Sequence, residues 1–278
     1  MRKIVRRGAI VLAFSVTVPA PVLAADLPTL KEAPAPAPAP IPSGWRFEAT
    51  INGWAPSSIA NAGVGHLPTV SSNLGFFTLL RHLNGVVPLA FTAKNENFIL
   101  GLDLYWSAVS AGAHVRASNT ALGPYGGLNG SLRLSETFLM GYAGVRLPIQ
   151  IANLAAYGIA GARFSNVNTT IDLNTFIPGI GLSGAQSENW TDPIIGFTAN
   201  YAFNDKWFLT TEADIGGTGN SATWQAFGAL GYNWTPRISS TVGFRALYVD
   251  YRKWNGDGGS FRFQQTLLGP QATISYAF

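Results

Sequence analysis

Apolar and polar side chains alternate along many segments of this chain, and this period of two constrains its fold more than any other feature. Residues 97–109 place Phe98, Leu100 and Leu102 on one face and Asp103 on the other. The same alternation runs through three other segments: 44–54, 206–216 and 222–234. Alternation over about ten residues, bounded by turn-forming residues, predicts half-buried β-strands.

The positions of the aromatic residues indicate what the apolar face contacts. One group lies beside the turns expected at 204–206 and 235–237 and at the chain ends: Trp45, Phe47, Tyr201, Phe203, Trp207, Tyr232, Trp234, Tyr276 and Phe278. A second group lies at the opposite strand ends: Trp54, Trp106, Trp190, Tyr248 and Trp254. Two aromatic belts around an aliphatic band are typical of membrane interfaces. Because strands in a bilayer must pair all their backbone groups, the fold class predicted is an all-β, transmembrane, antiparallel up-and-down barrel.

About ten strands are expected. They fall near 44–54, 84–94, 97–112, 130–147, 152–172, 187–203, 206–216, 221–234, 237–254 and 259–278, with long loops at 113–129, 173–186, 217–220 and 255–258. Residues 55–83 are ambiguous, since Phe76 to Leu83 has helix-like spacing and Ala62 to Ser72 could be a strand. We favour an outer loop with a short helix that folds over or into the lumen; a further pair of strands would give twelve.

The first residues form a secretory signal. A basic start is followed by an apolar run from Gly8 to Val18 and by the small-residue site Val22-Leu23-Ala24. We therefore expect residues 1–24 to be a signal peptide, cut between Ala24 and Ala25. Residues 25–43 are rich in Pro and Ala, with Pro34, Pro36, Pro38 and Pro40 alternating with Ala, and they predict an extended periplasmic linker. Residues 44–278 form the barrel domain.

Loss of the signal removes the net charge. The whole chain has 18 Lys and Arg against 14 Asp and Glu, and four of the bases lie in the signal, so the rest is neutral. The basic pI therefore reflects targeting, and no nucleic-acid partner is expected. The chain has no cysteine, so disulfides and thiolate chemistry are excluded.

The final strand carries a second targeting signal. Ala272, Ile274, Tyr276 and Phe278 share one face, and a last strand that ends in Phe with an aromatic two residues earlier resembles the assembly signal of outer-membrane proteins. The resemblance implies that Tyr276 and Phe278 are read by the barrel-assembly machinery after the secretion machinery has exported the chain. The expected location is the bacterial outer membrane, among lipid and lipopolysaccharide, with both termini in the periplasm.

A series of short motifs resembles an alphaproteobacterial family of small outer-membrane barrels, described as porin-family or opacity-type. The motifs are Ala25-Asp26-Leu27-Pro28, Gly44-Trp45-Arg46-Phe47, Asn52-Gly53-Trp54, Trp190-Thr191-Asp192-Pro193, Ala213-Asp214-Ile215-Gly216-Gly217, Thr223-Trp224-Gln225, Tyr248-Val249-Asp250-Tyr251 and Tyr276-Ala277-Phe278. The resemblance covers most of the mature chain and implies a barrel. It leaves function open, because small barrels serve as pores, anchors, adhesins and enzymes.

Charges are expected to line the lumen, since an Arg or Lys facing lipid at mid-bilayer costs about 2–4 kcal/mol. The strand phases turn eight inward: Arg46, Glu48, Asp103, Arg133, Arg163, Glu212, Asp214 and Arg245. Four bases and four acids can either line a pore or pair across a narrow interior. We therefore expect either porin-like passive passage of small polar solutes or a structural envelope protein. An adhesin is the alternative, with loops that carry Asn119, Tyr125, Asn174, Trp190 and Trp254.

No enzyme is expected. The chain has three histidines, His66, His82 and His114, which fall in expected loops and have no lipase-like or protease-like neighbours. A lipid-modifying barrel enzyme is the remote alternative, because catalytic partners need not be adjacent in sequence. No metal-ligand spacing is present, and no cofactor is expected. The oligomeric state stays open.

The signal assignment makes a direct prediction. The exported protein should begin at Ala25, and Ala24→Phe should leave the precursor uncut because signal peptidase requires a small residue there. Leu23→Phe, at the tolerant middle position, is the matched control and should be processed normally. Intact-mass measurement of the membrane-bound protein distinguishes these results, and normal processing of Ala24→Phe would contradict the assignment.

Overall fold

The protein is described by a computed structural model of residues 44–278, except for residues 68, 116–127, 175–180, 255 and 257–258. The signal peptide, its cleavage site and the linker lie outside the described residues and stay predictions. Within the described ranges, no helix is both long and apolar enough to cross a membrane.

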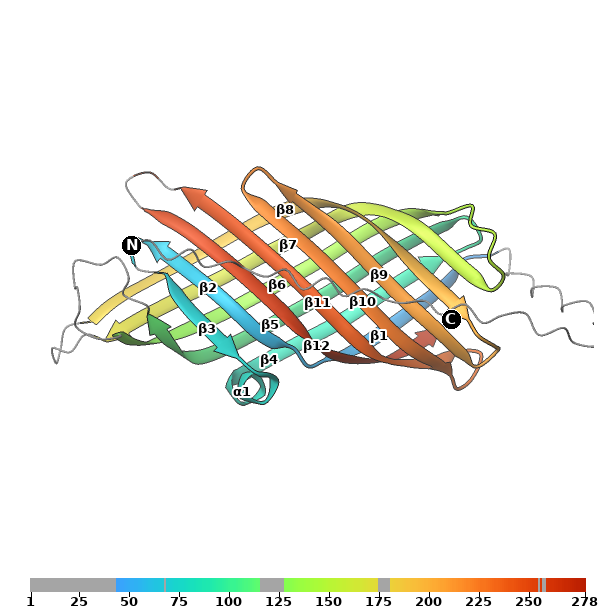
Figure 1. Cartoon of the computed structure of the whole chain (residues 1–278), viewed down its shortest axis with the longest axis horizontal. Helices are drawn as coiled ribbons and strands as arrows, with labels where there is room; N and C mark the ends of the chain where they lie inside the picture. The colour runs from blue at the N-terminus through green and yellow to red at the C-terminus, as the bar shows by residue number, and fades with distance from the viewer. Residues whose placement is uncertain (1–43, 68, 116–127, 175–180, 255, 257–258) are drawn as a thin grey trace, which may run out of the picture. The chain divides into compact units, whose positions relative to one another are not determined.

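In the described part of the chain, twelve strands form one closed antiparallel sheet, and there is one short helix (Figure 1). Consecutive strands pair from β4 to β12, and the sheet closes where β12 pairs with β1. The elements are β1 (Arg46–Trp54), β2 (Ser57–Gly65), β3 (Val70–Leu74), α1 (Phe76–His82), β4 (Leu83–Lys94), β5 (Phe98–Val115), β6 (Leu128–Arg146), β7 (Leu154–Asn174), β8 (Gly181–Ala202), β9 (Trp207–Thr218), β10 (Ser221–Asn233), β11 (Ile238–Trp254) and β12 (Ser260–Ala277).

These strands occupy ten positions around the wall. β1 and β2 follow one another along β12, with Glu48 opposite Ala277 and Gly65 opposite Ser260. β3 and β4 likewise both lie beside β5. The result is a ten-strand barrel with two extra strands, which confirms the predicted all-β barrel of about ten strands.

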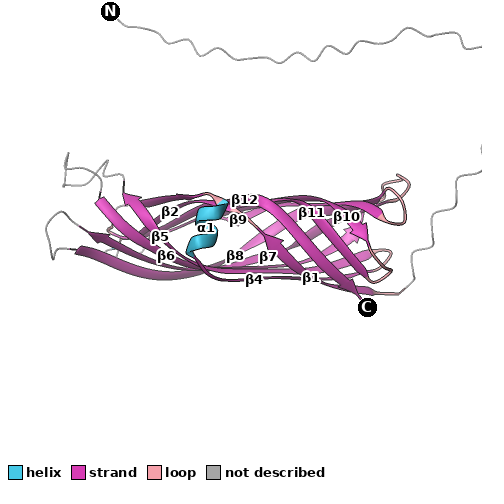
Figure 2. Ribbon diagram, turned by 90° about the horizontal axis from the view of Figure 1, so that it is seen from below, coloured by secondary structure: helices cyan, strands magenta, loops and turns pink. Residues whose placement is uncertain are grey.

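Residues 55–83 differ from the favoured prediction and match the alternative of a further pair of strands. We expected an outer loop whose helix folds over or into the lumen, whereas β2 and β3 continue the wall and α1 lies on its outer side (Figures 1 and 2). The helical spacing was identified correctly, but Phe77 and Leu80 face outward, at 75% and 54% exposure. Sequence periodicity cannot specify the side of the wall, because a helix of about two turns can pack on either face.

The two ends of the barrel differ in their connections. Tight turns join β4 to β5, β8 to β9 and β10 to β11 at one end, which we call the turn end. In these turns Asn95, Asn204 and Thr235 each accept two backbone N–H bonds through the side-chain oxygen. Such short polar side chains stabilise a turn by imitating a backbone acceptor. The opposite end, where β5 ends at Val115 and β6 begins at Leu128, is the loop end.

The two faces of β12 exchange their chemical character along the strand, while the same alternate residues point inward throughout. Near the turn end the outward residues are apolar, such as Leu268, Ile274 and Tyr276, and the inward residues Gln271, Thr273 and Ser275 are polar. Near the loop end the inward residues Phe261, Phe263 and Leu267 are fully buried, and the outward residues Arg262, Gln264 and Thr266 are polar. The outer face of β12 therefore suits contact with lipid in the half near the turn end and contact with water in the half near the loop end.

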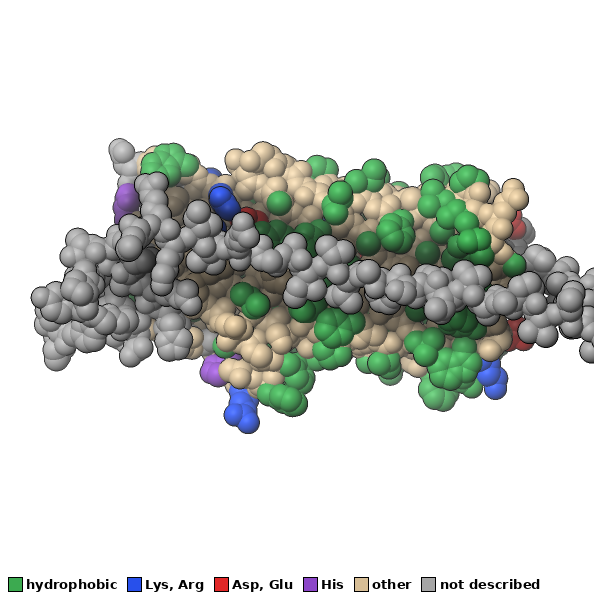
Figure 3. Space-filling model, viewed as in Figure 1, with side chains coloured by type: hydrophobic (Ala, Val, Ile, Leu, Met, Phe, Trp, Pro, Cys, Tyr) green, Lys and Arg blue, Asp and Glu red, His purple; other side chains and the backbone are tan. Residues whose placement is uncertain are grey.

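β11 reverses at the same level. Its outward face changes from Val242, Phe244 and Tyr248 to Asp250 and Arg252, and its inward face from Thr241 and Arg245 to Leu247, Val249 and Tyr251. Strands of 17 to 22 residues, such as β11 and β8, exceed the about 9–11 that cross a bilayer. Figure 3 accordingly shows apolar side chains spread over the outer surface between α1 and the turn end.

Two glycines near the turn end make room for inward aromatic rings. A Cβ built on Gly101 would lie 2.2 Å from the ring of Tyr142, and one on Gly231 would lie 2.2 Å from the ring of Phe208. Each ring lies flat against the neighbouring backbone, which is possible because glycine has no side chain.

We predict that Gly101→Ala destabilises the barrel by about 1–3 kcal/mol, because the new methyl displaces the Tyr142 ring. The urea midpoint of unfolding in lipid vesicles measures this loss. Gly228→Ala is the matched control, since its Cβ would meet its nearest neighbour, a Thr211 methyl, at 4.0 Å, and its midpoint should stay equal or rise slightly. Equal midpoints for both variants would contradict the packing described here.

Candidate functional site: a vestibule closed at mid-height

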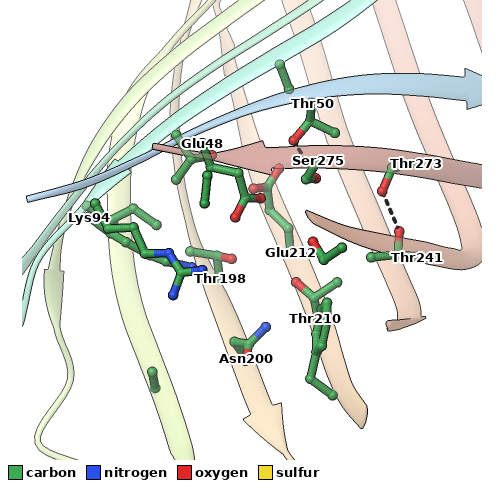
Figure 4. A pocket seen from close by; sticks show the side chains of 18 of the residues that line it. Glu48, Thr50, Lys94, Thr198, Asn200, Thr210, Glu212, Thr241, Thr273 and Ser275 are labelled. Carbon is green, nitrogen blue, oxygen red and sulfur yellow. Dashed lines mark hydrogen bonds between the residues drawn. The ribbon is translucent and has the colours of Figure 1, made fainter. Parts of the chain in front are cut away.

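The lumen near the turn end is a cavity of about 760 Å³, which we call the vestibule. Its walls carry hydroxyl, amide and charged side chains from several strands (Figure 4). Among them are Glu48, Thr50, Thr198, Asn200, Thr210 and Ser275. These residues face inward because each is the polar partner of an outward apolar residue in the alternation.

Short hydrogen bonds link neighbouring strands across the vestibule wall. The hydroxyl of Thr50 on β1 lies 2.8 Å from that of Ser275 on β12, and the hydroxyls of Thr241 and Thr273 are also 2.8 Å apart (Figure 4). Cross-strand hydroxyl pairs of this kind stabilise sheets. The vestibule is therefore a water-compatible space with firmly held walls.

The floor of the vestibule is a network around Arg245. Its guanidinium lies 2.8 Å from Asp103, donates to Gln225 at 2.6 Å and stacks over the ring of Trp54 at 4.9 Å. Gln225 in turn donates to Glu212, which also accepts the hydroxyl of Tyr142 at 3.1 Å. The network crosses the lumen, because its members come from β1, β5, β6, β9, β10 and β11.

A second ion pair lies beside this floor. Arg163 on β7 donates through one nitrogen to both carboxylate oxygens of Asp214 on β9, at 2.8 and 2.9 Å, and to Thr223 on β10 through the other. Arg163 is 1% exposed. A buried pair with this geometry offsets its desolvation cost through the several charge-assisted hydrogen bonds that it makes.

Above the two ion pairs the lumen is filled by an apolar core. Tyr105, Phe138, Leu247, Phe261, Phe263 and Leu267 belong to this cluster, which continues toward the loop end through Val167, Ile171 and Leu173. Trp190 stacks on Tyr251 with ring centroids 4.2 Å apart and donates its N–H to Asp192 at 3.1 Å. We call this cluster the apolar plug.

Seven of the eight predicted lumen charges lie inside. Arg163 and Asp214 pair with one another, Arg245 pairs with Asp103, and Glu212 joins the same network. Arg46 and Glu48 line the vestibule near its mouth, and Arg46 donates to the carbonyl of Pro236 at 3.1 Å.

Arg133 is the exception, and its inward assignment was wrong. It is exposed on the outer face of β6, while Leu132 and Leu134 on either side of it are buried in the plug. The prediction rests on an assumption that lipid surrounds the strand along its whole length, where an outward charge is costly. That assumption fails here because the alternation is reversed in the loop-end half.

The sequence reasoning missed the apolar plug. A signal was present, since Leu247 and Val249 share the predicted inward face of Arg245, and Phe261 and Phe263 share that of Thr273. Trp190 was likewise expected in a recognition loop, and it lies inside the barrel on β8. Asn174 ends β7, and Trp254 ends β11 at 76% exposure. Asn119 and Tyr125 lie outside the described residues.

Closure, the outward apolar band and the polar inward face of the turn-end half together define the class of fold as the outer-membrane type of β-barrel. No family model matches the sequence, and no curated protein does. Among solved structures, the chain is similar to the outer membrane protease OmpT from Escherichia coli, with a TM-score of 0.55 and 12% identity over 86% of this chain and 98% of that one.

Two autotransporter domains show weaker similarity. The translocator domain of NalP from Neisseria meningitidis gives a TM-score of 0.39 at 13% identity, over 84% of this chain and 88% of that one. The transport unit of AIDA-I from Escherichia coli gives 0.41 at 9% identity, over 92% and 94%. The alphaproteobacterial family suggested by the motifs is not among these findings, so the comparisons identify the barrel fold alone.

The expectation that the protein is not an enzyme is contradicted by the similarity to a protease. A barrel of this architecture is compatible with catalysis, and the absence of a lipase-like or protease-like sequence motif was insufficient to exclude it. Of the histidines, His82 lies on α1 and its Nδ1 donates to the carbonyl of Thr78 at 2.7 Å. His66 follows β2, and the backbone of His114 lies near the end of β5.

The buried ion pair makes a testable prediction. Arg163→Ala should destabilise the barrel by about 3–5 kcal/mol, because it leaves the carboxylate of Asp214 buried without its partner. The midpoint of unfolding by urea or guanidinium chloride, measured in lipid vesicles, reports this change. Arg252→Ala is the control, since Arg252 pairs with Asp250 at 3.1 Å on the exposed surface, and no measurable change is expected there. A similar loss of unfolding free energy in both variants would contradict the conclusion that the interior pair contributes more to stability than the surface pair.

Proposed function

We propose that the protein is an outer-membrane barrel whose lumen is closed above a vestibule, and that it serves as a structural envelope protein with its loop end outside the cell. The turn end and both chain termini then face the periplasm, since short turns are periplasmic and longer loops extracellular in bacterial barrels. The vestibule is accessible from the periplasm in this orientation.

The apolar plug carries this proposal. A diffusion pore needs a continuous water-filled path, whereas Phe261, Phe263 and Leu247 are at most 2% exposed within the loop-end half of the lumen. Close packing of these apolar side chains leaves little room between them for water or ions. The plug therefore favours the structural alternative over passive passage.

The charges support the same reading. A selective pore presents charges of one sign to a permeating ion, whereas here Arg163 and Arg245 are engaged by Asp214 and Asp103. Paired in this way, the charges stabilise one arrangement of the interior. They act as cross-links between β5, β7, β9 and β11.

The same placement gives roles to the chain ends. Tyr276 and Phe278 project outward at the turn end, where the ring of Phe278 lies 6.0 Å from that of Phe47. This edge is where the barrel closes, between β12 and β1, and it suits recognition by the barrel-assembly machinery. Outer-membrane lipid and lipopolysaccharide are the proposed surroundings, and the secretion machinery is the proposed export route.

Single-channel recording of the refolded mature protein in a planar bilayer tests the closed lumen. We expect no steady openings from the wild type, and none from Asp103→Asn, since the plug lies beyond the vestibule. A bacterial diffusion porin recorded in the same bilayer is the positive control. Heat-modifiable migration on a gel establishes that each sample is folded.

Steady openings whose size or ion preference changes with Asp103→Asn would overturn the structural proposal and favour porin-like passage. Arg133→Ala is a matched variant for that case. Because Arg133 lies on the outer face, its substitution should leave any conductance through the lumen unchanged.

A further inference from the structure

The barrel wall is interrupted beside α1. β3 pairs with β5 at Val70 and Ser71, and β4 resumes the pairing at Leu83, opposite Val109. Between these two ladders, residues 110–113 of β5 pair with β6 alone among the described strands. The wall therefore has a wedge-shaped gap on this side, and the chain that would fill it is wound outward as α1 (Figures 1 and 2).

One side chain of α1 closes the gap. Leu79 is 6% exposed and packs against Val109, with Leu74 and Leu83 beside it. Phe77 and Leu80 on the same helix face outward. Leu79 thus enters the wall from the outer side and, together with Leu74, lines the space behind it.

Behind Leu79 lies a cavity of about 20 Å³. Its lining is mainly apolar, with Leu79, Val109, Leu134 and Leu267, and its polar side is formed by Ser107 and Glu136. The volume is about that of one water molecule. An apolar pocket with a few convergent polar groups is the usual composition of a site for a small ligand.

The polar side of this cavity is incompletely satisfied. Glu136 is 2% exposed, and its Oε1 accepts the hydroxyl of Ser107 at 2.9 Å. Its Oε2 has no hydrogen-bond partner in the described part of the chain, and neither has the Oγ of Ser72 or the Oε1 of Gln265, which line the same cavity. Buried polar atoms are nearly always paired, so the acceptor oxygen of Glu136 can take a hydrogen bond from a donor that enters this cavity.

The gap lies at the level where the outer surface changes character. β2 runs beside β12 with Ser57 opposite Leu268 and Ile59 opposite Thr266, and α1 contacts β2, β3 and β5 at this height. Leu268 belongs to the apolar outward face of β12 and Thr266 to the polar one. A molecule with an apolar chain and a polar end concentrates at such a boundary.

We propose that this gap is a binding site for an amphipathic molecule that carries a hydroxyl group and enters from the membrane interface by displacing Leu79. Its apolar chain takes the place of the Leu79 side chain between Val109 and Leu134. Its hydroxyl donates to Glu136 Oε2. The ligand class is a long-chain alcohol or a lipid with a hydroxyl at its interfacial end, and α1 is the movable cover of the site.

A long-chain alcohol with a photoreactive diazirine on its chain tests the proposal in vesicles that contain the folded full-length barrel. The label should appear by mass spectrometry on the peptides with Val109 and Leu134, in excess over the lipid-facing Ile215 on β9. Glu136→Leu should reduce this excess about tenfold, the weight of one lost hydrogen bond. Leu79→Trp, whose larger side chain fills the gap, should abolish it.

Phe77→Ala is the matched control on the same helix, since Phe77 points away from the cavity, and the labelling excess should be unchanged. The corresponding alkane probe, which lacks the hydroxyl, should show no dependence on Glu136. Equal labelling of Val109 and Ile215, or an excess that survives both Glu136→Leu and Leu79→Trp, would overturn the proposal. The site rests on the proposed membrane placement. Absence of label at both Val109 and Ile215 would overturn that placement and the site together, whereas label at Ile215 alone would overturn only the site.

Discussion

The need to pair every backbone group where there is no water governs this molecule. It requires closed ladders from β4 through β12 and back to β1, and it makes any interruption of the wall costly. The interruption beside α1 occurs where the outward faces of β11 and β12 change from apolar to polar. At that level water and lipid headgroups can satisfy the groups that the ladder leaves open.

Closure of the wall also determines the interior. Ten strand positions enclose a lumen narrow enough for side chains from opposite walls to meet, as Arg163 and Asp214 or Trp190 and Tyr251 do. Near the turn end the inward side chains are short hydroxyl and amide groups, and space remains. Near the loop end they are aromatic and aliphatic, and the space is filled.

Much of this could be predicted from the sequence, because alternation and turn chemistry are local. Asn95, Asn204 and Thr235 define three turns, and the aromatic residues beside them define one edge of the apolar band. The level at which the alternation reverses is not local, since the same pattern around Arg133 fits either face until neighbouring strands are placed. The pairing of Arg245 with Asp103, and the position of α1 outside the wall, depend on contacts between residues distant in sequence.

The reversed faces of β11 and β12 have a mechanical consequence. A barrel that is apolar outside along its whole length could shift along the bilayer normal at little cost. In this barrel the depth of insertion is fixed, because the outward and inward faces both change character at the same level. Bilayers of different thickness would therefore strain only the half near the turns. The half with the apolar interior would keep a constant height above the membrane, like a soluble domain mounted on a transmembrane base.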